Sequence, residues 1–478
     1  MDLLEPMVQP YAWGSRTAIA ELQGRHAPAP GPEAELWMGA HPSAPSVVER
    51  HGGRTTLDAV IAADPADELG AECAAEFGGR LPFLLKVLAA EKALSIQVHP
   101  SRKQAQAGFA EENERGLAPT AAGRNYVDDW PKPEMLCALT RFEVLAGMRD
   151  SDDAAALLSA LEVPQLAPLV AELATGNRPA DDSSAADRSG ADGANDDLAG
   201  ARADVRTDVL ARLLSWPISQ RSALIASVVA ACERLAAGDG PYAAVAAATA
   251  RIAGDHPGDM GIVASLLLRY SVLEPGQAMF MAAGGLHAYL HGTGIELLAN
   301  SDNVVRAGLT GKHIDVPELL KLTDPAVGVP LIKERDLGDG VWAYDSPAPE
   351  FRLFRAEPGA GQLTLPVTGP RLVLCTEGTV TLTDAAGNTL KAARGESCFL
   401  SAADGVVVAS GPGVMFLAAT GSCALSLSAA PARPQSRIGP YRHPQPLALA
   451  LGHRGRRGLS RRARRLSMPM VPYAVPGT

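Results

Sequence analysis

Residues 287–312 read HAYLHGTGIELLANSDNVVRAGLTGK, and this stretch carries four side chains of different chemistry. They are the imidazole of His287, the carboxylate of Glu296, the guanidinium of Arg306 and the amine of Lys312. The stretch lies in sequence of strand character, because short apolar runs broken by turn residues resume at Ser271. It therefore supplies groups for binding and catalysis, but its spacing alone does not assemble them into a site.

Two earlier segments supply further groups that suit a metal ion. In LSIQVHP, Gln97 and His99 stand two residues apart on an expected strand, so alternation points both side chains to one face. In KPE, Glu134 follows a rigid proline. Together with His287 these residues make a four-ligand set that zinc accepts, with room for a substrate oxygen. The alternatives are that each histidine is structural and that Glu134 is a buried partner of Lys132.

The stretch at 287–312 resembles the signature of type I mannose-6-phosphate isomerases, which are zinc enzymes of the cupin superfamily. Shorter matches follow in the family's order: YAWGS at 11–15, ELWMGAHP at 35–42, LSIQVHP at 94–100 and KPE at 132–134. The β-rich segment 351–427 is similar to the family's C-terminal cupin barrel. The resemblance implies an aldose–ketose isomerase that interconverts mannose 6-phosphate and fructose 6-phosphate.

The resemblance also implies, residue by residue, which positions form the site. The ligands of one zinc ion per chain are Gln97, His99, Glu134 and His287. The catalytic residues are Arg306, Glu296 and Lys132. The substrate-binding residues are Lys86, Ser95, Lys312 and Trp13. The alternatives are a structural ion pair of Arg306 with Asp302, a solvated Lys86 and a core role for Trp13, while His41 and His291 are expected outside the ligand set.

The chemistry of isomerisation explains why these residue types suit the site. A proton moves between C1 and C2 through an enediolate, and a Lewis acid or fixed cations stabilise the charge that develops on the two oxygens. Arginine stays protonated at any working pH, so Arg306 suits this stabilisation better than proton abstraction. The base is then Glu296 or a zinc-bound water, and the sequence does not choose between them. The 6-phosphate needs Lys, Arg or hydroxyl donors.

Two positions depart from the family pattern. Trp130-Pro131 stands where the family often has Asn-His, and that histidine is a candidate proton carrier; Gly311 stands where the family usually has proline. We interpret both departures as compatible with activity, because the ligand set and Arg306 are intact. Two other functions remain as alternatives: a catalytically silent cupin that binds a sugar phosphate as a sensor, and a cupin metal oxygenase. The fourth ligand, Gln97, and the lysines speak against the oxygenase.

The texture of the whole sequence predicts a mainly β protein with a helical insertion, in the form of cupin-type antiparallel β-barrels (jelly-roll) plus an α-helical subdomain. Strands are expected at 371–375, 379–383, 397–400 and 414–418, and Pro217 is expected to separate two helices. The catalytic cupin domain is expected in two parts, residues 1–150 and 269–330, which flank a helical subdomain at 151–268 with a disordered loop at 176–208. A C-terminal cupin-like barrel is expected at 331–432, and a disordered Arg-rich tail at 433–478.

The charge of the chain is distributed unevenly. The whole chain has 43 Lys+Arg and 53 Asp+Glu, a net charge of −10. Residues 433–478 hold ten arginines and no acidic residue, which leaves 33 basic and 53 acidic groups in residues 1–432, a local charge of −20. Such an acidic body argues against nucleic acid as the main partner, since phosphate binding needs clustered Lys and Arg.

Composition bounds the class of protein and its compartment. Apolar residues make up 47% of the chain, enough for a core, but no apolar run reaches the 18 residues that a membrane span needs. The N-terminus lacks the basic region of a secretory signal, and the six cysteines form no C-x-x-C pair. We therefore expect a cytoplasmic monomer that binds a small sugar phosphate and neither nucleic acid nor membrane. Its place in carbohydrate metabolism is open between GDP-mannose biosynthesis and mannose catabolism.

Overall fold

The computed structural model describes residues 1–50, 52–176, 204–423 and 425. The chain divides into two compact units, Met1–Ala432 and Arg433–Thr478, and every described residue belongs to the first. The predicted tail and residues 177–203 of the predicted loop lie outside the described residues. None of the helices within the described ranges combines the length and the apolar character needed to cross a bilayer.

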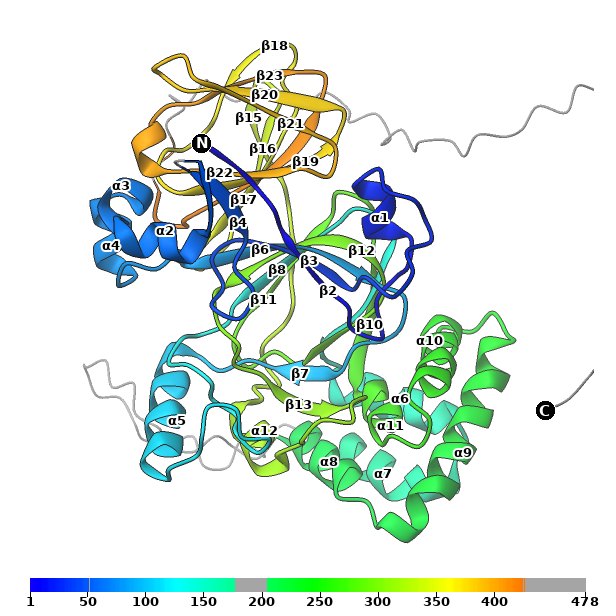
Figure 1. Cartoon of the computed structure of the whole chain (residues 1–478). Coiled ribbons are helices and arrows are strands. Elements are labelled where there is room, and N and C mark those ends of the chain that lie inside the picture. The colour runs from blue at the N-terminus through cyan, green and yellow to red at the C-terminus, as the bar shows by residue number, and fades with distance from the viewer. Residues whose placement is uncertain (51, 177–203, 424, 426–478) are drawn as a thin grey trace, which may run out of the picture. The chain divides into compact units, whose positions relative to one another are not determined.

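An antiparallel sheet of eleven described strands forms the middle of the first unit (Figure 1). Its main path runs through β14 (Leu331–Ile332), β11 (Ala278–Met281), β8 (Glu134–Ala138), β12 (His287–Ala299), β6 (Phe83–Ala90), β3 (Glu35–Met38) and β2 (Met7–Gln9). Off this path lie β7 (Ile96–Val98), β9 (Phe142–Met148), β10 (Leu268–Leu273) and β13 (Val305–Gly308). The strand β12 is the longest of these and belongs to both parts of the sheet.

A bend in β12 lets one strand serve both parts. Its first half pairs with β7 and β9, and its second half pairs with β6 and β8. The register shifts between Tyr289 and His291, and Gly292 follows with a φ of 131°. A Cβ at this position would lie 2.8 Å from the carbonyl oxygen of Arg141, so only glycine fits the bend. Residues from both halves of the strand can therefore face one cavity.

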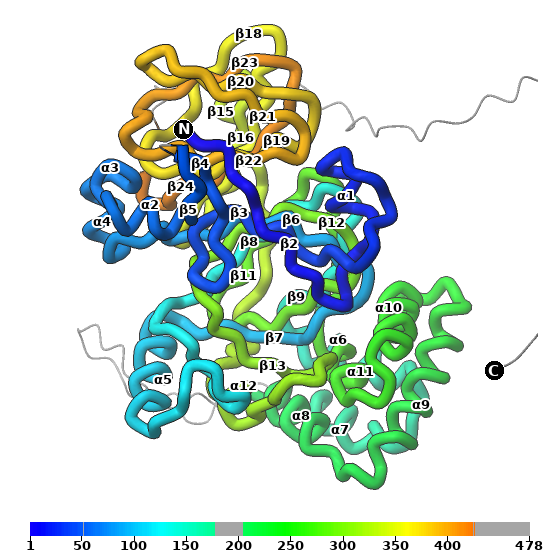
Figure 2. Tube along the Cα trace, viewed as in Figure 1, coloured from blue at the N-terminus to red at the C-terminus, as the bar shows by residue number. Residues whose placement is uncertain are grey.

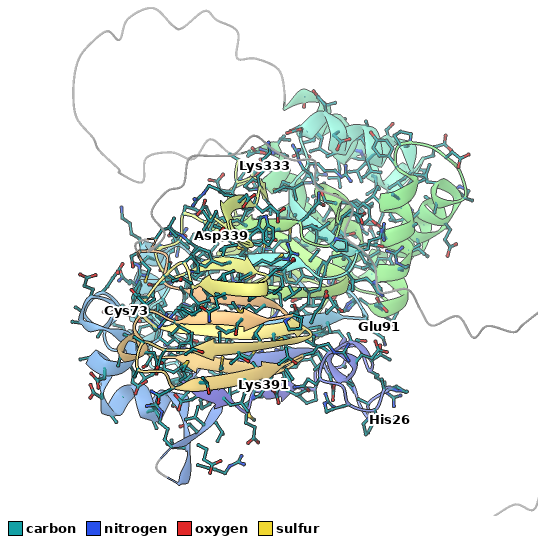
Figure 3. All side chains as sticks on the ribbon, turned by 90° about the horizontal axis from the view of Figure 1, so that it is seen from above. His26, Cys73, Glu91, Lys333, Asp339 and Lys391 are labelled. Carbon is teal, nitrogen blue, oxygen red and sulfur yellow. The ribbon has the colours of Figure 1, made fainter. Side chains whose placement is uncertain are left out.

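Two further sheets form the C-terminal barrel, and Figure 3 shows its yellow and orange strands side by side. The seven-stranded sheet contains β1 (Asp2–Leu4), β22 (Ser397–Leu400), β19 (Arg371–Glu377), β24 (Val414–Ala419), β17 (Arg352–Ala356), β16 (Val341–Tyr344) and β15 (Arg335–Gly338). The four-stranded sheet contains β18 (Gly359–Thr364), β23 (Val408–Gly411), β20 (Thr379–Thr383) and β21 (Thr389–Ala393). Buried side chains from both sheets, among them Val373 and Leu382, share one core. The fold is thus the cupin-type β fold expected from the sequence, and the four strands predicted there are confirmed.

The N-terminal strand β1 joins the sheet of the C-terminal barrel (Figure 2). Its residue Asp2 pairs with Phe399 of β22, and Leu4 pairs with Ser397. The expected boundaries assigned residues 1–150 to the catalytic domain alone and did not include this exchange. Short polar-and-apolar strands at the end of a chain carry no sequence signal for their partner.

Helices of the 151–268 segment gather on one side of the central sheet (Figure 1). They are α6 (Ser151–Ala160), η1 (Pro164–Leu166), α7 (Ala167–Thr175), α8 (Val205–Leu214), α9 (Ile218–Ala236), α10 (Ala243–Asp255), α11 (Gly261–Ala264) and η2 (Ser265–Leu267). Their apolar faces form one core with Ile96 and Val98 of β7 and Leu145 of β9. Each fully buried leucine in such a core contributes about 1.5–3 kcal/mol.

The sequence was right about Pro217 and partly wrong about the loop before it. The helix α8 ends at Leu214 and α9 begins at Ile218, so the proline does separate two helices. The predicted loop extended to residue 208, but α8 already begins at Val205. The side chain of Asp204 caps this helix by accepting a hydrogen bond from the Arg206 N–H at 2.8 Å.

The remaining elements connect these layers. They are α1 (Ala18–Leu22), the hairpin β4 (Val47–Arg50) and β5 (Gly53–Thr56), α2 (Leu57–Ala63), α3 (Pro65–Leu69), α4 (Ala71–Glu76), α5 (Arg102–Glu114), α12 (Val316–Leu322) and η3 (Ala402–Asp404). The helix α5 begins with a capping box, in which Ser101 and Gln104 satisfy each other's backbone N–H groups. This box fixes the chain directly after the segment that carries Gln97 and His99.

Candidate active site

Three side chains from distant segments meet at one buried point. His99 follows β7, Glu134 begins β8 and His287 begins β12. The Nε2 atom of His99 lies 3.4 Å from Oε1 of Glu134, and the Nε2 atom of His287 lies 3.4 Å from Oε2 of the same carboxylate. The possible ligand atoms of all three residues lie within 4.8 Å of one another. The fold therefore brings together three of the four residues that the resemblance implied as zinc ligands.

The outer ring nitrogens of the two histidines are held by backbone carbonyls. The Nδ1–H of His99 donates to the Asn303 carbonyl at 2.8 Å, and that of His287 donates to the Gly285 carbonyl at 3.1 Å. Because a carbonyl only accepts, both rings carry their proton on Nδ1 and turn the Nε2 lone pair toward Glu134. No described residue gives these Nε2 atoms or Glu134 Oε2 a hydrogen bond. A cation between them satisfies all three buried atoms, so this donor set fits zinc.

The protonation states of the cluster suit a cation as well. Burial, helped by the charge of Lys132, lowers the pKa of His99 to about 4 against the opposing pull of Glu134, so the ring is neutral near pH 7. Burial opposes ionisation of Glu134, but the ammonium charge of Lys132 favours it and helps to hold the pKa of this carboxyl well below its usual range. A neutral imidazole and an ionised carboxylate are the forms that bind a metal.

The strand register places Gln97 on the same face of the sheet as His287. Gln97 is the direct partner of His287 on β12 and of Arg306 on β13. Directly opposed residues of antiparallel strands have Cβ atoms about 5 Å apart and point to the same side. The strand β7 ends at Val98, so His99 reaches the cluster from just beyond the strand, and the simple alternation expected from the sequence applies only to Gln97.

A cavity of about 410 Å³ adjoins the cluster and includes Gln97 and Glu134 in its wall. Its size lies within the range of small-molecule sites. The other predicted site residues outside the histidine pair also line it: Trp13, Lys86, Ser95, Lys132, Glu296, Arg306 and Lys312. The cavity is also lined by residues for which no role was predicted from the sequence, among them Tyr11, Glu35, His256 and Tyr289. Tyr11 and Glu35 lie within motifs quoted from the sequence. Glu35 stands two residues before Trp37, and this alternation was the available signal that both side chains face the same side.

Lys86 lies between two carboxylates in this cavity. Its Nζ is 3.2 Å from Glu296 Oε2 and 3.6 Å from Glu35 Oε1, and it lies 4.9 Å from the ring centre of Trp37. The register explains the arrangement, because Lys86 on β6 is opposite Glu296 on β12 and opposite Trp37 on β3. Burial alone would lower the pKa of Lys86, but Glu35 and Glu296 outweigh it and raise the pKa. The lysine is therefore charged. The alternative considered from the sequence, a solvated Lys86, is not what the structure shows.

Glu296 has the properties of a tunable carboxyl group. Burial raises its pKa, Lys86 opposes this effect, and Glu134 and Glu35 add to it, so the net shift is upward. The hydroxyl of Tyr289, which lines the same cavity, is buried without a hydrogen bond from the described residues. A carboxyl with a raised pKa beside a fixed ammonium group is typical of a general acid or base.

The other cations of the cavity differ in their partners. Lys132 Nζ lies 3.2 Å from Glu134 Oε1, so it pairs with the cluster. Arg306 and Lys312 have no ion pair with any described residue. The structural pair of Arg306 with Asp302 is absent among these residues, because Asp302 Oδ1 instead lies 3.4 Å from His41 Nε2. Burial lowers the pKa of Arg306. Burial also lowers the pKa of Lys312, and the nearby positive charge of Arg306 lowers it further.

Trp130, at the first departure from the family pattern, points into the protein core. Its ring lies 6.2 Å from that of Phe77, and the guanidinium of Arg80 lies 4.3 Å from its ring centre. Pro131 is buried beside it and carries no titratable group. The segment therefore contributes an anchor to the core, and the proton carrier must be another residue.

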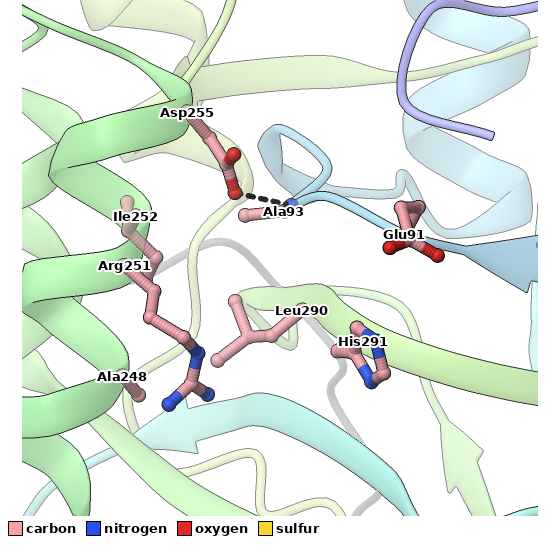
Figure 4. Close-up of a pocket in the computed structure, with 8 residues that line it drawn as sticks. All are labelled: Glu91, Ala93, Ala248, Arg251, Ile252, Asp255, Leu290 and His291. Carbon is pink, nitrogen blue, oxygen red and sulfur yellow. Dashed lines mark hydrogen bonds between the residues drawn. The ribbon is translucent and has the colours of Figure 1, made fainter. Parts of the chain in front are cut away.

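A second, smaller cavity of about 270 Å³ lies next to the first (Figure 4). It lies between α10 and the strands, and its wall includes His291 and Arg251. Ala93 lines both cavities. Figure 4 shows Asp255, at the end of α10, accepting a hydrogen bond from the Ala93 N–H at 3.2 Å. His291 therefore lies away from the metal cluster, outside the ligand set as the sequence indicated.

The fold and the cluster define a metal-binding protein of the cupin class. Residues 1–151 match the family of the phosphomannose isomerase type I catalytic domain. The mannose-6-phosphate isomerase of Escherichia coli (strain K12) is 34% identical over 422 residues, which cover 86% of this chain and 98% of that protein. The mannose-6-phosphate isomerase of Mus musculus is 30% identical over 423 residues, 85% of this chain and 94% of that protein. The chain belongs to the type I phosphomannose isomerase family.

Solved structures agree with this assignment. The crystal structure of a zinc-bound mannose 6-phosphate isomerase matches with a TM-score of 0.74 and 33% identity, covering 88% of this chain and 99% of that one. A mutant of the phosphomannose isomerase from Salmonella typhimurium matches with a TM-score of 0.75 over the same shares of the two chains. The family resemblance read from the sequence is confirmed.

Proposed function

We propose that this chain interconverts mannose 6-phosphate and fructose 6-phosphate and uses one zinc ion per chain. The observation that carries the proposal is the buried His99–Glu134–His287 cluster, whose inward-facing ligand atoms lie beside a cavity with several fixed cations. Relatives named for this activity in bacteria, fungi and mammals match most of the chain. A cupin that only senses a sugar phosphate would not need an intact ligand set.

The zinc ligands in this proposal are Gln97, His99, Glu134 and His287. When bound there, zinc supplies a Lewis acid that needs no redox chemistry. Support for Gln97 comes from its register with His287, and support for the other three comes from their unsatisfied buried atoms. Lys132 pairs with Glu134 and keeps a positive charge beside the cluster.

The proton transfer is assigned to Glu296 in this proposal. Its carboxylate takes the proton from one carbon of the substrate and returns it to the neighbouring carbon, while the hydroxyl proton passes between the two adjacent substrate oxygens. The raised pKa brings the carboxyl group closer to the working pH. Arg306, which no described carboxylate neutralises, stabilises the negative charge of the enediolate. The loss of a histidine at position 131 then removes no required step.

The phosphate end of the substrate is assigned to Lys312 and Ser95, because Lys312 has no described ion-pair partner. Lys86 is already flanked by two carboxylates, so we assign it to the sugar hydroxyls and to holding Glu296 in place. Trp13 lies 5.8 Å from Tyr11 between ring centres, and the two stacked rings form an apolar wall of the cavity.

We also propose a monomeric, cytoplasmic protein without nucleic-acid or membrane partners. We retain the subdomain boundaries expected from the sequence, except that β1 belongs to the sheet of the C-terminal barrel and that α8 already begins at Val205. Free cysteines support a reducing compartment: all six lie among the described residues and none is in a disulfide. The acidic body supports the absence of a nucleic-acid partner. The gathering of helices from residues 151–267 supports a helical subdomain.

A coupled assay of fructose 6-phosphate formation tests the function. The zinc-loaded protein should turn over mannose 6-phosphate, a chelator should abolish the activity, and added zinc should restore it. Zinc-loaded protein without turnover would contradict the isomerase assignment. Turnover that survives complete removal of the metal would contradict the role of zinc.

A further inference from the structure

Asn303 lies in the short connection between β12 and β13 and is fully buried. Its side-chain Oδ1 accepts hydrogen bonds from the backbone N–H groups of Val127 at 2.8 Å and Asp128 at 3.2 Å. Its Nδ2 donates to the backbone carbonyls of Asp128 at 2.7 Å and Trp130 at 2.9 Å. An amide has two donor hydrogens and two acceptor lone pairs, so one side chain with all of them in use joins two loops.

The backbone carbonyl of the same residue holds a member of the metal cluster. It accepts the Nδ1–H of His99 at 2.8 Å, which leaves Nε2 of His99 directed at Glu134. The side chain of Asn303 therefore fixes the position of an oxygen that orients His99. Groups in this second layer commonly change metal affinity by about 10- to 100-fold when they are removed.

The loop on the other side of Asn303 is itself anchored in the core. Trp130, whose carbonyl accepts from Asn303, is 5% exposed, and its ring lies under the guanidinium of Arg80. Ser301 Oγ donates to the side chain of Asp128 at 2.8 Å and thereby ties the loop a second time. The tryptophan at this departure from the family pattern thus places the loop against rigid core, and the loop in turn carries Lys132.

We infer that Asn303 is a positioning residue of the zinc site: it joins the Trp130-anchored loop to His99 and so sets the metal affinity. The inference rests on the zinc site proposed above. Asn303 is not among the residues that line the cavity, and it is not one of the proposed ligands. Its effect reaches the metal through the orientation of the His99 ring.

The zinc affinity of variants, measured by competition with a chromophoric chelator, tests the inference. Asn303→Ala removes all the side-chain bonds, and Asn303→Asp keeps the shape but loses the Nδ2 donations to Asp128 and Trp130. Both should bind zinc about 10- to 100-fold more weakly than the unchanged protein. Asn125→Ala is the matched control, because this asparagine lies in the loop that carries Trp130 and its side chain bonds Asp315 at 2.9 Å and not the loop of Asn303. Its zinc affinity should stay at the level of the unchanged protein.

A second measurement separates positioning from general loss of stability. Melting curves of the zinc-free proteins report the stability of the fold. If Asn303 is a positioning residue, its variants should lose more zinc affinity than Asn125→Ala does, even where the melting temperatures of the zinc-free proteins are equal. Folded Asn303 variants with unchanged zinc affinity would overturn the inference. Failure of both variants to fold would also overturn it, since the residue would then serve the fold as a whole. Absence of zinc binding by the unchanged protein would instead contradict the proposed function.

Discussion

At the scale of single residues, the cavity is defined by which of its cations are neutralised. Lys86 has Glu35 and Glu296 as neighbours, and Lys132 has Glu134. Arg306 and Lys312 have no such partner among the described residues. An unpaired guanidinium in a partly desolvated cavity interacts more strongly with a developing negative charge than a paired one does.

Replacement of Arg306 by alanine should therefore lower kcat far more than it weakens zinc binding. We expect a loss of about 10²- to 10³-fold in kcat, the usual effect of removing one group that stabilises transition-state charge. Steady-state kinetics and a zinc titration of the same preparation measure the two effects. Arg306→Lys, which keeps the charge but not the planar geometry, should recover part of the rate. A parallel loss of zinc would show that Arg306 has a structural role beside Gln97, its register partner.

The raised pKa of Glu296 predicts a pH dependence whose sign follows from the base role. The carboxylate is the active form, so kcat/KM should fall as the pH falls through the raised pKa. Glu35 contributes to this upward shift, and Glu35→Gln removes its charge while still accepting the hydrogen bond that Trp37 Nε1 donates at 2.6 Å. The acid limb of the kcat/KM profile should then move to lower pH. Glu91→Gln, at an exposed position, should leave the limb in place. An unmoved limb in Glu35→Gln would argue against Glu296 as the base.

At the scale of elements, the end of α10 clamps the segment that leads into β7. Asp255 accepts from the Ala93 N–H at 3.2 Å (Figure 4). His256 Nε2–H donates to the Ala93 carbonyl at 2.7 Å. Both peptide groups of one residue are thus held by the helical segment. Ser95 follows two residues later, and His256 itself lines the catalytic cavity.

Loss of this clamp should weaken substrate binding without loss of metal. Asp255→Ala should raise KM about tenfold, which corresponds to about 1.4 kcal/mol, while kcat and zinc affinity stay close to those of the unchanged protein. The reason is that β7 keeps its pairing with β12 and β13 beyond Ser95. Asp255→Asn can still accept the Ala93 N–H and should restore KM. Exposed Asp239 offers a matched control, and an equal KM change in Asp239→Ala would contradict the role of the clamp.

Elements with local patterns were predictable from the sequence, and those that depend on register were not. The strand at 379–383 alternates with period two and coincides with β20, and Pro217 has a local effect on helices. In contrast, Glu35, Lys86 and Glu296 meet only because β3, β6 and β12 pair in one particular register. The helical start at Val205 was missed because the Asp- and Ala-rich composition before it outweighed the capping signal of Asp204.

The site itself was predictable only through the family resemblance. Gln97, His99, Glu134 and His287 lie nearly 200 residues apart in sequence, and no local rule joins them. The resemblance named these residues, but it gave no reason for Asn303, whose role rests on its backbone carbonyl and on the hydrogen bonds of its side chain. A residue of this kind cannot be recognised from the spacing of residues in the sequence, because each of its hydrogen bonds depends on the conformation of a loop.

At the scale of the whole molecule, a strongly negative body must bind a negative substrate. Residues 1–432 carry a charge of −20, and the ten arginines of residues 433–478 offset half of it. All predicted site residues lie in the unit Met1–Ala432. The local field of the cavity therefore depends on Lys86, Lys132, Arg306 and Lys312, while the rest of the charge acts only through the long-range field.

Removal of residues 433–478 should therefore leave kcat and zinc affinity unchanged, since no ligand or cavity residue is lost. The net charge of the protein changes from −10 to −20, so repulsion of the sugar phosphate should raise KM at low ionic strength. At about 0.15 M salt the screening length is about 8 Å, and the difference in KM should disappear. Kinetics of the full-length and shortened proteins across a salt series measure both effects. A loss of kcat that persists at high salt would show that the C-terminal residues take part in catalysis through direct contact and not through their charge.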